Sequence, residues 1–350
     1  MRLHVTILST ALITSSLALG SACDGGKQPA ETKTETKAET KAETKAEPPA
    51  PKEKTEEEKQ EEGRKKNAER LKELDEEMQK ETARWTDEVK AKVKALSEKN
   101  WKKTKDALKA ILASPHRVPE NVERDGQRHP AETLEFLGVT PEMTVVEIGP
   151  GAGWYTEILA PLLVKKGKLI ITDFDPDGPD HEWTSFAGKR MQAFLGRSPE
   201  LFGKVEREVQ KSYKEFSLGE DASVDFVFFV RGMHGWHNGG SLEQNLKEVH
   251  RALKPGGTLA IVQHRAAEGA NADESSKKGY LPEAWVIEQV EKAGFELVEK
   301  SEVNANPKDT KDYSEGVWTL PPTLTLKDTD RDKYVAIGES DRMTLKFRKK

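Results

Sequence analysis

The segment VVEIGPGAGWYTEIL, from Val145 to Leu159, constrains the fold of this chain more than any other. A short apolar run leads into three glycines at alternate positions, Gly149, Gly151 and Gly153, and then into a segment of helical composition. Glycine lets a ligand approach the backbone closely, and the N-terminus of the following helix offers free N–H groups to an anion. The segment therefore predicts a strand, a ligand-binding turn and a helix.

Strand-like and helix-like segments alternate along the chain on both sides of this turn. Short apolar runs predict buried strands, and longer amphipathic segments predict helices. We expect strands at Thr144–Ile148, Lys168–Thr172, Val224–Val230 and Thr258–Gln263, and helices that include Ala131–Leu137, Tyr155–Val164 and Leu242–Leu253. This alternation predicts an α/β fold, with a doubly wound, mostly parallel sheet flanked by helices.

The first residues of the chain have the pattern of a secretory signal peptide, which we assign to residues 1–22. Their apolar stretch is too short for a good membrane-spanning helix. Cys23 is the only cysteine, and its position resembles the lipobox of bacterial lipoproteins. We therefore expect lipidation at Cys23 and an exported protein anchored to a membrane of the bacterial envelope. The alternative is a plain signal cut after Ala22, which would leave a soluble periplasmic or secreted protein.

Two further segments precede the globular part. Residues 23–54 are rich in Lys, Glu, Thr, Ala and Pro and predict a lipid-anchored, disordered tether, because mixed charge without apolar residues cannot offset the entropy of ordering. Residues 55–113 predict a long, mostly solvated, charged helix with a narrow apolar stripe that includes Leu74, Trp85 and Leu96. A sparse coiled coil is the alternative, with self-association through residues 64–112. Lysines alternate with glutamates and the net charge is only −5, so no nucleic-acid partner is expected.

The glycine turn departs from the common nucleotide-binding fingerprints. Trp154 stands where the dinucleotide pattern requires its last glycine, which argues against a nicotinamide-dependent dehydrogenase. No Gly-Lys-Ser/Thr follows, so a phosphate-binding P-loop is excluded as well. Glu147 would repel a pyrophosphate and suits a ligand with an amino group. Asp173 closes the second strand, where an acid can accept hydrogen bonds from both hydroxyls of a ribose, and an LKPGG turn precedes the strand TLAIV.

At these residues the chain resembles the class I S-adenosylmethionine-dependent methyltransferases. Residues 117–350, about two thirds of the chain, resemble a family of bacterial predicted methyltransferases, many of them exported. The matching segments are RDGQRHPAETLEFLGV, EIGPGAGWYTEILAP, MHGWHN, SEVNANPKDTKDYSEGVWTLPPT and IGESDRMTLKF. The resemblance implies a Rossmann-like fold and S-adenosylmethionine as cofactor. It also implies that Glu147, Gly149, Gly151 and Gly153 surround the methionine part and that Asp173 contacts the ribose.

Candidates for the reaction follow the fourth and fifth strands. Methyl transfer from a sulfonium is a direct displacement, so the protein mainly positions donor and acceptor, and a base is needed only where the acceptor must lose a proton. The candidate bases are His237, His234 and His264, and the candidate substrate contacts are Arg231, Trp236, Asn306 and Asp309. Each candidate also has a purely structural interpretation. The histidines could be hydrogen-bonded structural residues, and Arg231 could brace its loop. Trp236 could pack in the core, and Asn306 and Asp309 could belong to a solvated loop. No metal site is expected.

The sequence thus predicts a methyltransferase that acts on an unidentified small-molecule or envelope acceptor. The alternative is a non-catalytic binding or structural lipoprotein that retains the fold. The alternative arises because the usual methyl donor is made in the cytoplasm, whereas the first residues of the chain predict export.

Overall fold

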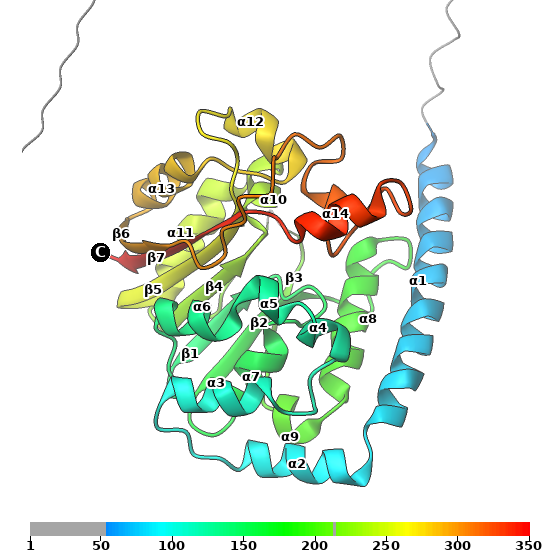
Figure 1. Cartoon of the computed structure of the whole chain (residues 1–350), viewed down its shortest axis with the longest axis vertical. Helices are drawn as coiled ribbons and strands as arrows, with labels where there is room; N and C mark the ends of the chain where they lie inside the picture. The colour runs from blue at the N-terminus through cyan, green and yellow to red at the C-terminus, as the bar shows by residue number, and fades with distance from the viewer. Residues whose placement is uncertain (1–53, 213–214) are drawn as a thin grey trace, which may run out of the picture. The chain divides into compact units, whose positions relative to one another are not determined.

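The computed structural model describes residues 54–212 and 215–350, with a seven-stranded sheet at the centre (Figure 1). In spatial order the strands are β3 (Glu206–Gln210), β2 (Lys168–Phe174), β1 (Thr144–Ile148), β4 (Val224–Val230), β5 (Leu253–His264), β7 (Arg342–Lys349) and β6 (Phe295–Ser301). The first five strands are mutually parallel, and β7 is antiparallel to both of its neighbours. The order reverses between β1 and β4, which is where ligands bind in such sheets. The predicted doubly wound, mostly parallel fold is confirmed.

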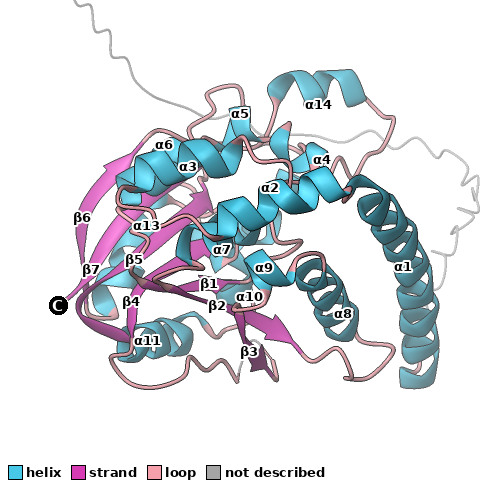
Figure 2. Cartoon of the chain, turned by 90° about the horizontal axis from the view of Figure 1, so that it is seen from below, coloured by secondary structure: helices cyan, strands magenta, loops and turns pink. Residues whose placement is uncertain are grey.

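Helices lie on both sides of this sheet (Figure 2). One face carries α2 (Asp87–Ser97), α3 (Thr104–Leu112), α6 (Pro130–Leu137), α7 (Thr156–Leu163), α8 (Trp183–Gly196) and α9 (Pro199–Phe202). The other face carries α10 (Met233–Asn238), α11 (Leu242–Ala252) and α13 (Glu283–Lys292). The remaining elements are α1 (Glu56–Arg84), α4 (Pro119–Val122), α5 (Asp125–Arg128), α12 (Ala272–Ser275), α14 (Arg331–Ile337) and the 3-10 turns η1 (Ser276–Lys278) and η2 (Gly316–Thr319).

Strand β4 shows why these apolar runs form central strands. Phe226 and Phe228 belong to the core under α7, whereas Val227 and Phe229 belong to the core under α11. Successive side chains of a strand point to opposite faces, so a strand covered on both faces must be apolar at every position. The run VDFVFFV meets this requirement at every position except the second, Asp225.

The predicted long helix is present as α1 (Glu56–Arg84), but the helical region over residues 55–113 is not continuous. It is divided into α1, α2 and α3, with breaks after Arg84 and Ser97. Most of its residues are exposed, as predicted, but Trp85, Val93, Leu108 and Ile111 are buried in the core that covers one face of the sheet. Most of the apolar stripe that suggested self-association therefore packs against other helices of the same chain. α1 packs on α8, α2 packs on α9 and α3 packs on α7.

The predicted signal peptide, Cys23 and nearly all of the predicted tether lie outside the described residues. Among helices in the described part of the chain, none has an apolar stretch long enough to cross a membrane.

Candidate active site

A cavity of about 460 Å³ opens at the carboxyl ends of the parallel strands. Five strands or the turns that follow them contribute to its wall, together with a segment near the C-terminus. The lining residues are Ile148, Gly149, Thr172, Asp173, Phe174, Gln210, Ser212, Phe216, Phe229, Val230, Arg231, Gly232, His234, Gly235, Trp236, His264, Val317, Trp318, Pro321, Pro322 and Thr323. The cavity thus spans the point where the strand order reverses, where the sequence predicted a ligand.

The glycine turn forms the floor at one end of the cavity. Gly149, Gly151 and Gly153 all have positive φ, at 62°, 64° and 84°, which L-residues rarely adopt. The N–H of Gly149 donates to the Thr172 hydroxyl over 2.9 Å and so joins the turn to β2. Only Gly149 of the three lines the cavity. Gly153 has a packing role instead, because a Cβ there would lie 2.5 Å from the ring of Phe194.

Glu147 does not line the cavity, contrary to the predicted contact with a ligand amino group. Its side chain lies beneath the turn, 3% exposed, and accepts a hydrogen bond of 2.7 Å from the Thr156 hydroxyl. Burial raises the pKa of Glu147 to about 7, and the hydrogen bond from Thr156 opposes this. The described geometry therefore gives Glu147 the role of connecting β1 to the first turn of α7.

Asp173 lines the cavity at the end of β2, as predicted. One carboxylate oxygen accepts from the backbone N–H of Phe174 over 2.8 Å, and the other accepts from Nε of Arg207 over 2.7 Å. Burial raises the pKa of Asp173, while these two contacts oppose the rise. Arg207 was not anticipated from the sequence, because β3 was not predicted as a strand and only its pairing with β2 brings the two residues together.

His234 lines the cavity after β4, and its hydrogen bond defines its tautomer. Nε2 of Gln263 donates to Nδ1 of His234 over 3.3 Å and to the Gly279 carbonyl, while Oε1 of Gln263 accepts from the N–H of Met233. The orientation of the Gln263 amide is set by the last two contacts, so Nδ1 of His234 accepts and the neutral ring carries its proton on Nε2. Burial lowers the pKa of His234 to about 4. At neutral pH this histidine is a hydrogen-bond donor and a poor base.

His264 ends β5 and also lines the cavity. Its Nδ1 lies 2.5 Å from the hydroxyl of Ser340, and its side chain is 7% exposed. Burial, and then the charge of Arg231, hold the pKa of His264 well below its usual value. His264 is therefore neutral at physiological pH, like His234.

His237 does not line the cavity, so its predicted catalytic role is not supported by its position. It lies at the end of α10, where Nε2 is 2.8 Å from a carboxylate oxygen of Asp273 and the ring packs edge-on against Trp285. The short helix α10 directs His234 and His237 to different surroundings.

Arg231 and Trp236, two of the candidate substrate contacts, both line the cavity. Trp236 is 2% exposed and packs against Phe216 and Phe229, so it forms a wall of the cavity that is also part of the core. Arg231 follows β4 directly and has φ of 56°, an uncommon conformation for a residue other than glycine. Its N–H donates to the Val262 carbonyl over 2.7 Å. Burial lowers the pKa of Arg231 to about 10, so the guanidinium remains charged.

Comparison with known proteins agrees with this geometry. Residues 146–261 match the family model of the methyltransferase domain. Residues 69–176 also match the model of the protein-L-isoaspartate (D-aspartate) O-methyltransferases. Both models describe methyltransferases, and each match covers about a third of the chain. No curated protein matches the sequence.

Several solved methyltransferase structures are similar to the chain. An S-adenosylmethionine-dependent methyltransferase from Aquifex aeolicus has 21% sequence identity and a TM-score of 0.42, over 65% of this chain and 92% of its own. One from Mesorhizobium loti has 13% identity and a TM-score of 0.42, over 64% of this chain and 99% of its own. One from Methanosarcina mazei has 16% identity and a TM-score of 0.41, over 62% of this chain and 96% of its own.

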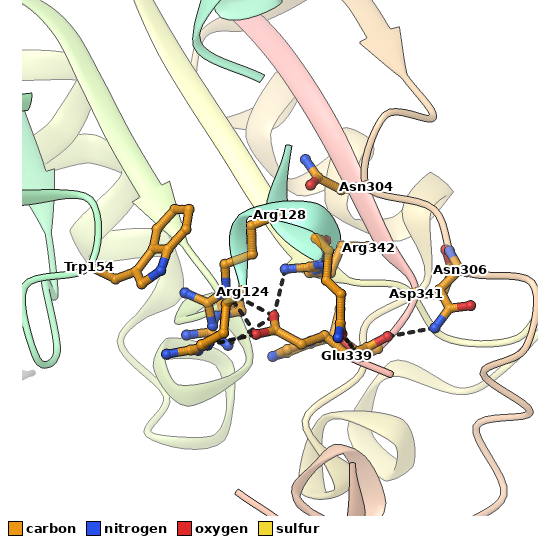
Figure 3. Close-up of polar contacts among 12 residues, drawn as sticks. Arg124, Arg128, Trp154, Asn304, Asn306, Glu339, Asp341 and Arg342 are labelled. Carbon is orange, nitrogen blue, oxygen red and sulfur yellow. Dashed lines mark hydrogen bonds and ion pairs between the residues drawn. The ribbon is translucent and has the colours of Figure 1, made fainter. Parts of the chain in front are cut away.

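Arg231, on the cavity wall, belongs to a cluster of arginines around one carboxylate, and Figure 3 shows Arg124, Arg128 and Arg342 of this cluster. Glu339 lies at its centre, 3% exposed, and accepts from Nε of Arg124 over 3.0 Å, Nε of Arg128 over 2.9 Å and Nη1 of Arg342 over 2.9 Å. Nη1 of Arg231 is 3.9 Å from the same carboxylate. We call Glu339 and these four arginines the Glu339 cluster.

Asn306 and Asp309, the other two predicted substrate contacts, do not line the cavity. Nδ2 of Asn306 donates to the carbonyls of Ile337 and Glu339 over 2.9 and 2.7 Å. Asp309 accepts from the N–H of Asp341 over 2.8 Å and from the hydroxyl of Tyr280. Both side chains thus hold the segment that carries Glu339, and the polar composition that suggested a substrate loop reflects this buried network.

The segment that contains η2 closes the cavity opposite the strands. Val317, Trp318, Pro321, Pro322 and Thr323 contribute to the wall, and the Pro321–Pro322 bond is cis. The ring of Trp318 lies 5.9 Å from that of His234. No group of three or more histidine, cysteine or acidic side chains arranged to hold a metal occurs among residues 54–212 and 215–350.

Proposed function

We propose that this cavity binds S-adenosylmethionine and that the protein transfers its methyl group to a small-molecule or envelope acceptor. The observation that carries the proposal is the division of one cavity into two chemically distinct ends. Gly149 and Asp173 lie at the ends of β1 and β2, and Arg231, His234 and His264 lie at the ends of β4 and β5. A donor and an acceptor held in one cavity are placed for direct displacement.

The residues at the first end fit the proposed cofactor. A Cβ added to Gly149 or Gly151 would meet no atom within 4 Å, so the backbone of the turn is open to a ligand. The Asp173 carboxylate can accept hydrogen bonds from ribose hydroxyls while Arg207 and the Phe174 N–H hold it in place. Gly149 and Asp173 would thus hold the cofactor, whereas Glu147 would act only through the turn.

S-Adenosylmethionine supplies a methyl group on a positively charged sulfur. The chain's own residues exclude water and orient the acceptor: Trp236 and Trp318 provide apolar walls, and His234 presents an Nε2–H donor. Because His234 and His264 are both poor bases here, we assign neither of them the removal of a proton in a neutral solution.

Binding measurements test the proposal on the full-length protein. S-Adenosylmethionine or S-adenosylhomocysteine at about 100 times its dissociation constant should add about 2.7 kcal/mol to the free energy of unfolding, and NAD should add nothing. Asp173→Asn should weaken the affinity by about ten-fold to a hundred-fold, since it removes a charged acceptor. Asp175→Asn is the matched control, because Asp175 is exposed two residues further on. Absence of any shift with either sulfur nucleotide would support the non-catalytic alternative.

We also propose that the protein is exported and anchored to the envelope through a lipid on Cys23, as its N-terminal sequence suggests. Membrane fractionation of wild type and Cys23→Ser tests this. The wild type should sediment with membranes and the variant should be soluble. A Cys23→Ser protein that still sediments with membranes contradicts the lipid anchor.

A further inference from the structure

The charged groups of the cavity wall differ in how well they are neutralised. Among the described lining residues, Asp173 and Arg231 are the two with a permanent charge at neutral pH, since burial keeps His234 and His264 uncharged. Asp173 has a hydrogen-bonded cation, Arg207, at 2.7 Å. Arg231 has only Glu339, at 3.9 Å. The positive end of the cavity is therefore less well neutralised than the negative end.

Competition within the Glu339 cluster explains this difference. Four guanidinium groups share one carboxylate, and Arg124, Arg128 and Arg342 are each about 3 Å from it. Asp341, the next acid along the chain, pairs with Lys311 at 2.7 Å and so does not balance the excess. Nη2 of Arg128 and Nε of Arg342 are buried and donate no hydrogen bond to any described residue. The cluster thus carries excess positive charge in a place with little water.

Arg231 is the member of this cluster that reaches the cavity. It lines the wall with a side chain that is 28% exposed, and no hydrogen bond from its guanidinium to the described part of the chain is present. Its backbone is left-handed, with φ of 56°, and such strained residues cluster at active sites and ligand clamps. A guanidinium in this situation binds an anion, and its paired donors match the two oxygens of a carboxylate.

The remainder of this end is apolar. Phe216, Phe229, Trp236, Trp318 and Pro322 contribute to the wall. The two histidines are poor bases, and His234 holds its proton on the nitrogen opposite Gln263. A phenol, thiol or ammonium acceptor would have to lose a proton before or during transfer. A carboxylate is already ionised at neutral pH and needs no base.

We infer that the methyl acceptor is a carboxylic acid with an apolar body, whose carboxylate binds Arg231 and receives the methyl group on oxygen. The inference rests on the proposed methyltransferase function. The carboxylate oxygen forms the new bond to carbon with its own electron pair, and the sulfur–carbon bond breaks with its pair remaining on sulfur. One negative and one positive charge disappear, the products are a methyl ester and a thioether, and no proton moves. The neutral ester loses its ion pair with Arg231, which favours product release.

Calorimetry with matched probes tests this on the full-length protein saturated with S-adenosylhomocysteine. Benzoate and hexanoate are the carboxylate probes, and benzamide, hexanamide and methyl benzoate are their uncharged counterparts. We expect each carboxylate to bind at least about ten-fold more tightly than its uncharged counterpart, as one charge-assisted contact provides. Arg231→Gln should remove this preference and leave S-adenosylhomocysteine binding unchanged. Arg231→Lys, which keeps the charge but not the paired donors, should retain part of it.

The control variant is Arg251→Gln. Arg251 is a paired arginine on α11 outside the cavity wall, so this variant should bind every probe like the wild type. Thermal unfolding of all three variants shows whether they are folded. If Arg231→Gln does not fold, the test is made with Arg231→Lys.

Three results would overturn the inference. The first is equal binding of carboxylates and amides, and the second is no binding of either carboxylate to wild-type protein. The third is a folded Arg231→Gln variant that no longer binds S-adenosylhomocysteine, because Arg231 would then hold the methionyl carboxylate of the cofactor. Failure of the wild type to bind S-adenosylhomocysteine contradicts the proposed function instead. The probes are then measured without S-adenosylhomocysteine. A carboxylate preference that depends on Arg231 would show that the anion site exists independently of the proposed methyltransferase function.

Discussion

The two ends of the cavity are built from different kinds of contact. At the end with Asp173, the contacts are mostly local: the hydrogen bond from Gly149 to Thr172 joins residues 23 positions apart. At the end with Arg231, the ion pair of Arg128 with Glu339 joins residues 211 positions apart. The first end depends on consecutive strand–helix units, and the second depends on three distant segments meeting. The difference teaches that the end with Asp173 is encoded locally, whereas the end with Arg231 is a product of the whole fold.

The largest effect on stability should come from the Glu339 cluster. Glu339→Gln removes the one carboxylate among four arginines, and loss of a partner from a buried ion pair typically costs about 3–5 kcal/mol. Denaturant unfolding measures this. Glu296→Gln is the control, since Glu296 forms an exposed pair with Arg348 and should cost less than about 1 kcal/mol. Equal losses in the two variants would mean that the end of the cavity with Arg231 does not depend on its distant contacts.

The buried carboxyl under the glycine turn should produce a pH-dependent effect. The pKa of Glu147 is about 7 when folded, against 4.5 unfolded, so its contribution to stability is fully present below pH 4.5 and is lost as pH rises through 7. Relative to wild type, Glu147→Gln should therefore gain about 3 kcal/mol in unfolding free energy between pH 4.5 and pH 8.5.

Unfolding of wild type and variant in urea across this pH range measures the gain. The exposed Glu135 provides a control variant, Glu135→Gln, which should show no comparable change. A constant difference between Glu147→Gln and wild type would show that Glu147 is ionised in the folded protein.

The smallest effect should distinguish two glycines of the same turn. Alanine at Gly149 adds only the strain of a positive φ, about 1 kcal/mol, because its Cβ meets nothing within 4 Å. Alanine at Gly153 adds the same strain and also a Cβ 2.5 Å from Phe194, which should cost about 1–3 kcal/mol more. Thermal unfolding compares the two. Equal losses would mean that Phe194 moves aside without cost.

Several features of the site followed from the sequence. The strand β1, the glycine turn, Asp173 and the strand ends that carry Arg231, His234 and His264 all lie where the motifs predicted. Sequence reasoning was less successful wherever a side chain's surroundings decide its role. Glu147 looked like a ligand contact and is buried, and Asn306 and Asp309 looked like a substrate loop and support Glu339.

Residues 55–113 show the same limit on a larger scale. Their composition is that of a solvated helix, yet Trp85, Val93, Leu108 and Ile111 are buried against α7, α9 and their neighbours. A short apolar stripe predicts that one face of a helix is covered, but it does not identify what covers it. The packing of α1–α3 on the domain could therefore not be predicted from the sequence alone.

The sequence by itself determined the α/β fold, the position of the glycine turn and the acid at the end of β2. These features depend on apolar periodicity, on the conformational freedom of glycine and on neighbours close in the chain. Only the tertiary structure decided that Arg207 pairs with Asp173, that Glu339 is shared by four arginines and that Gln263 sets the tautomer of His234. The physical reason is that the charge and hydrogen bonding of a buried group depend on partners brought together by folding, and distance along the chain carries no information about them.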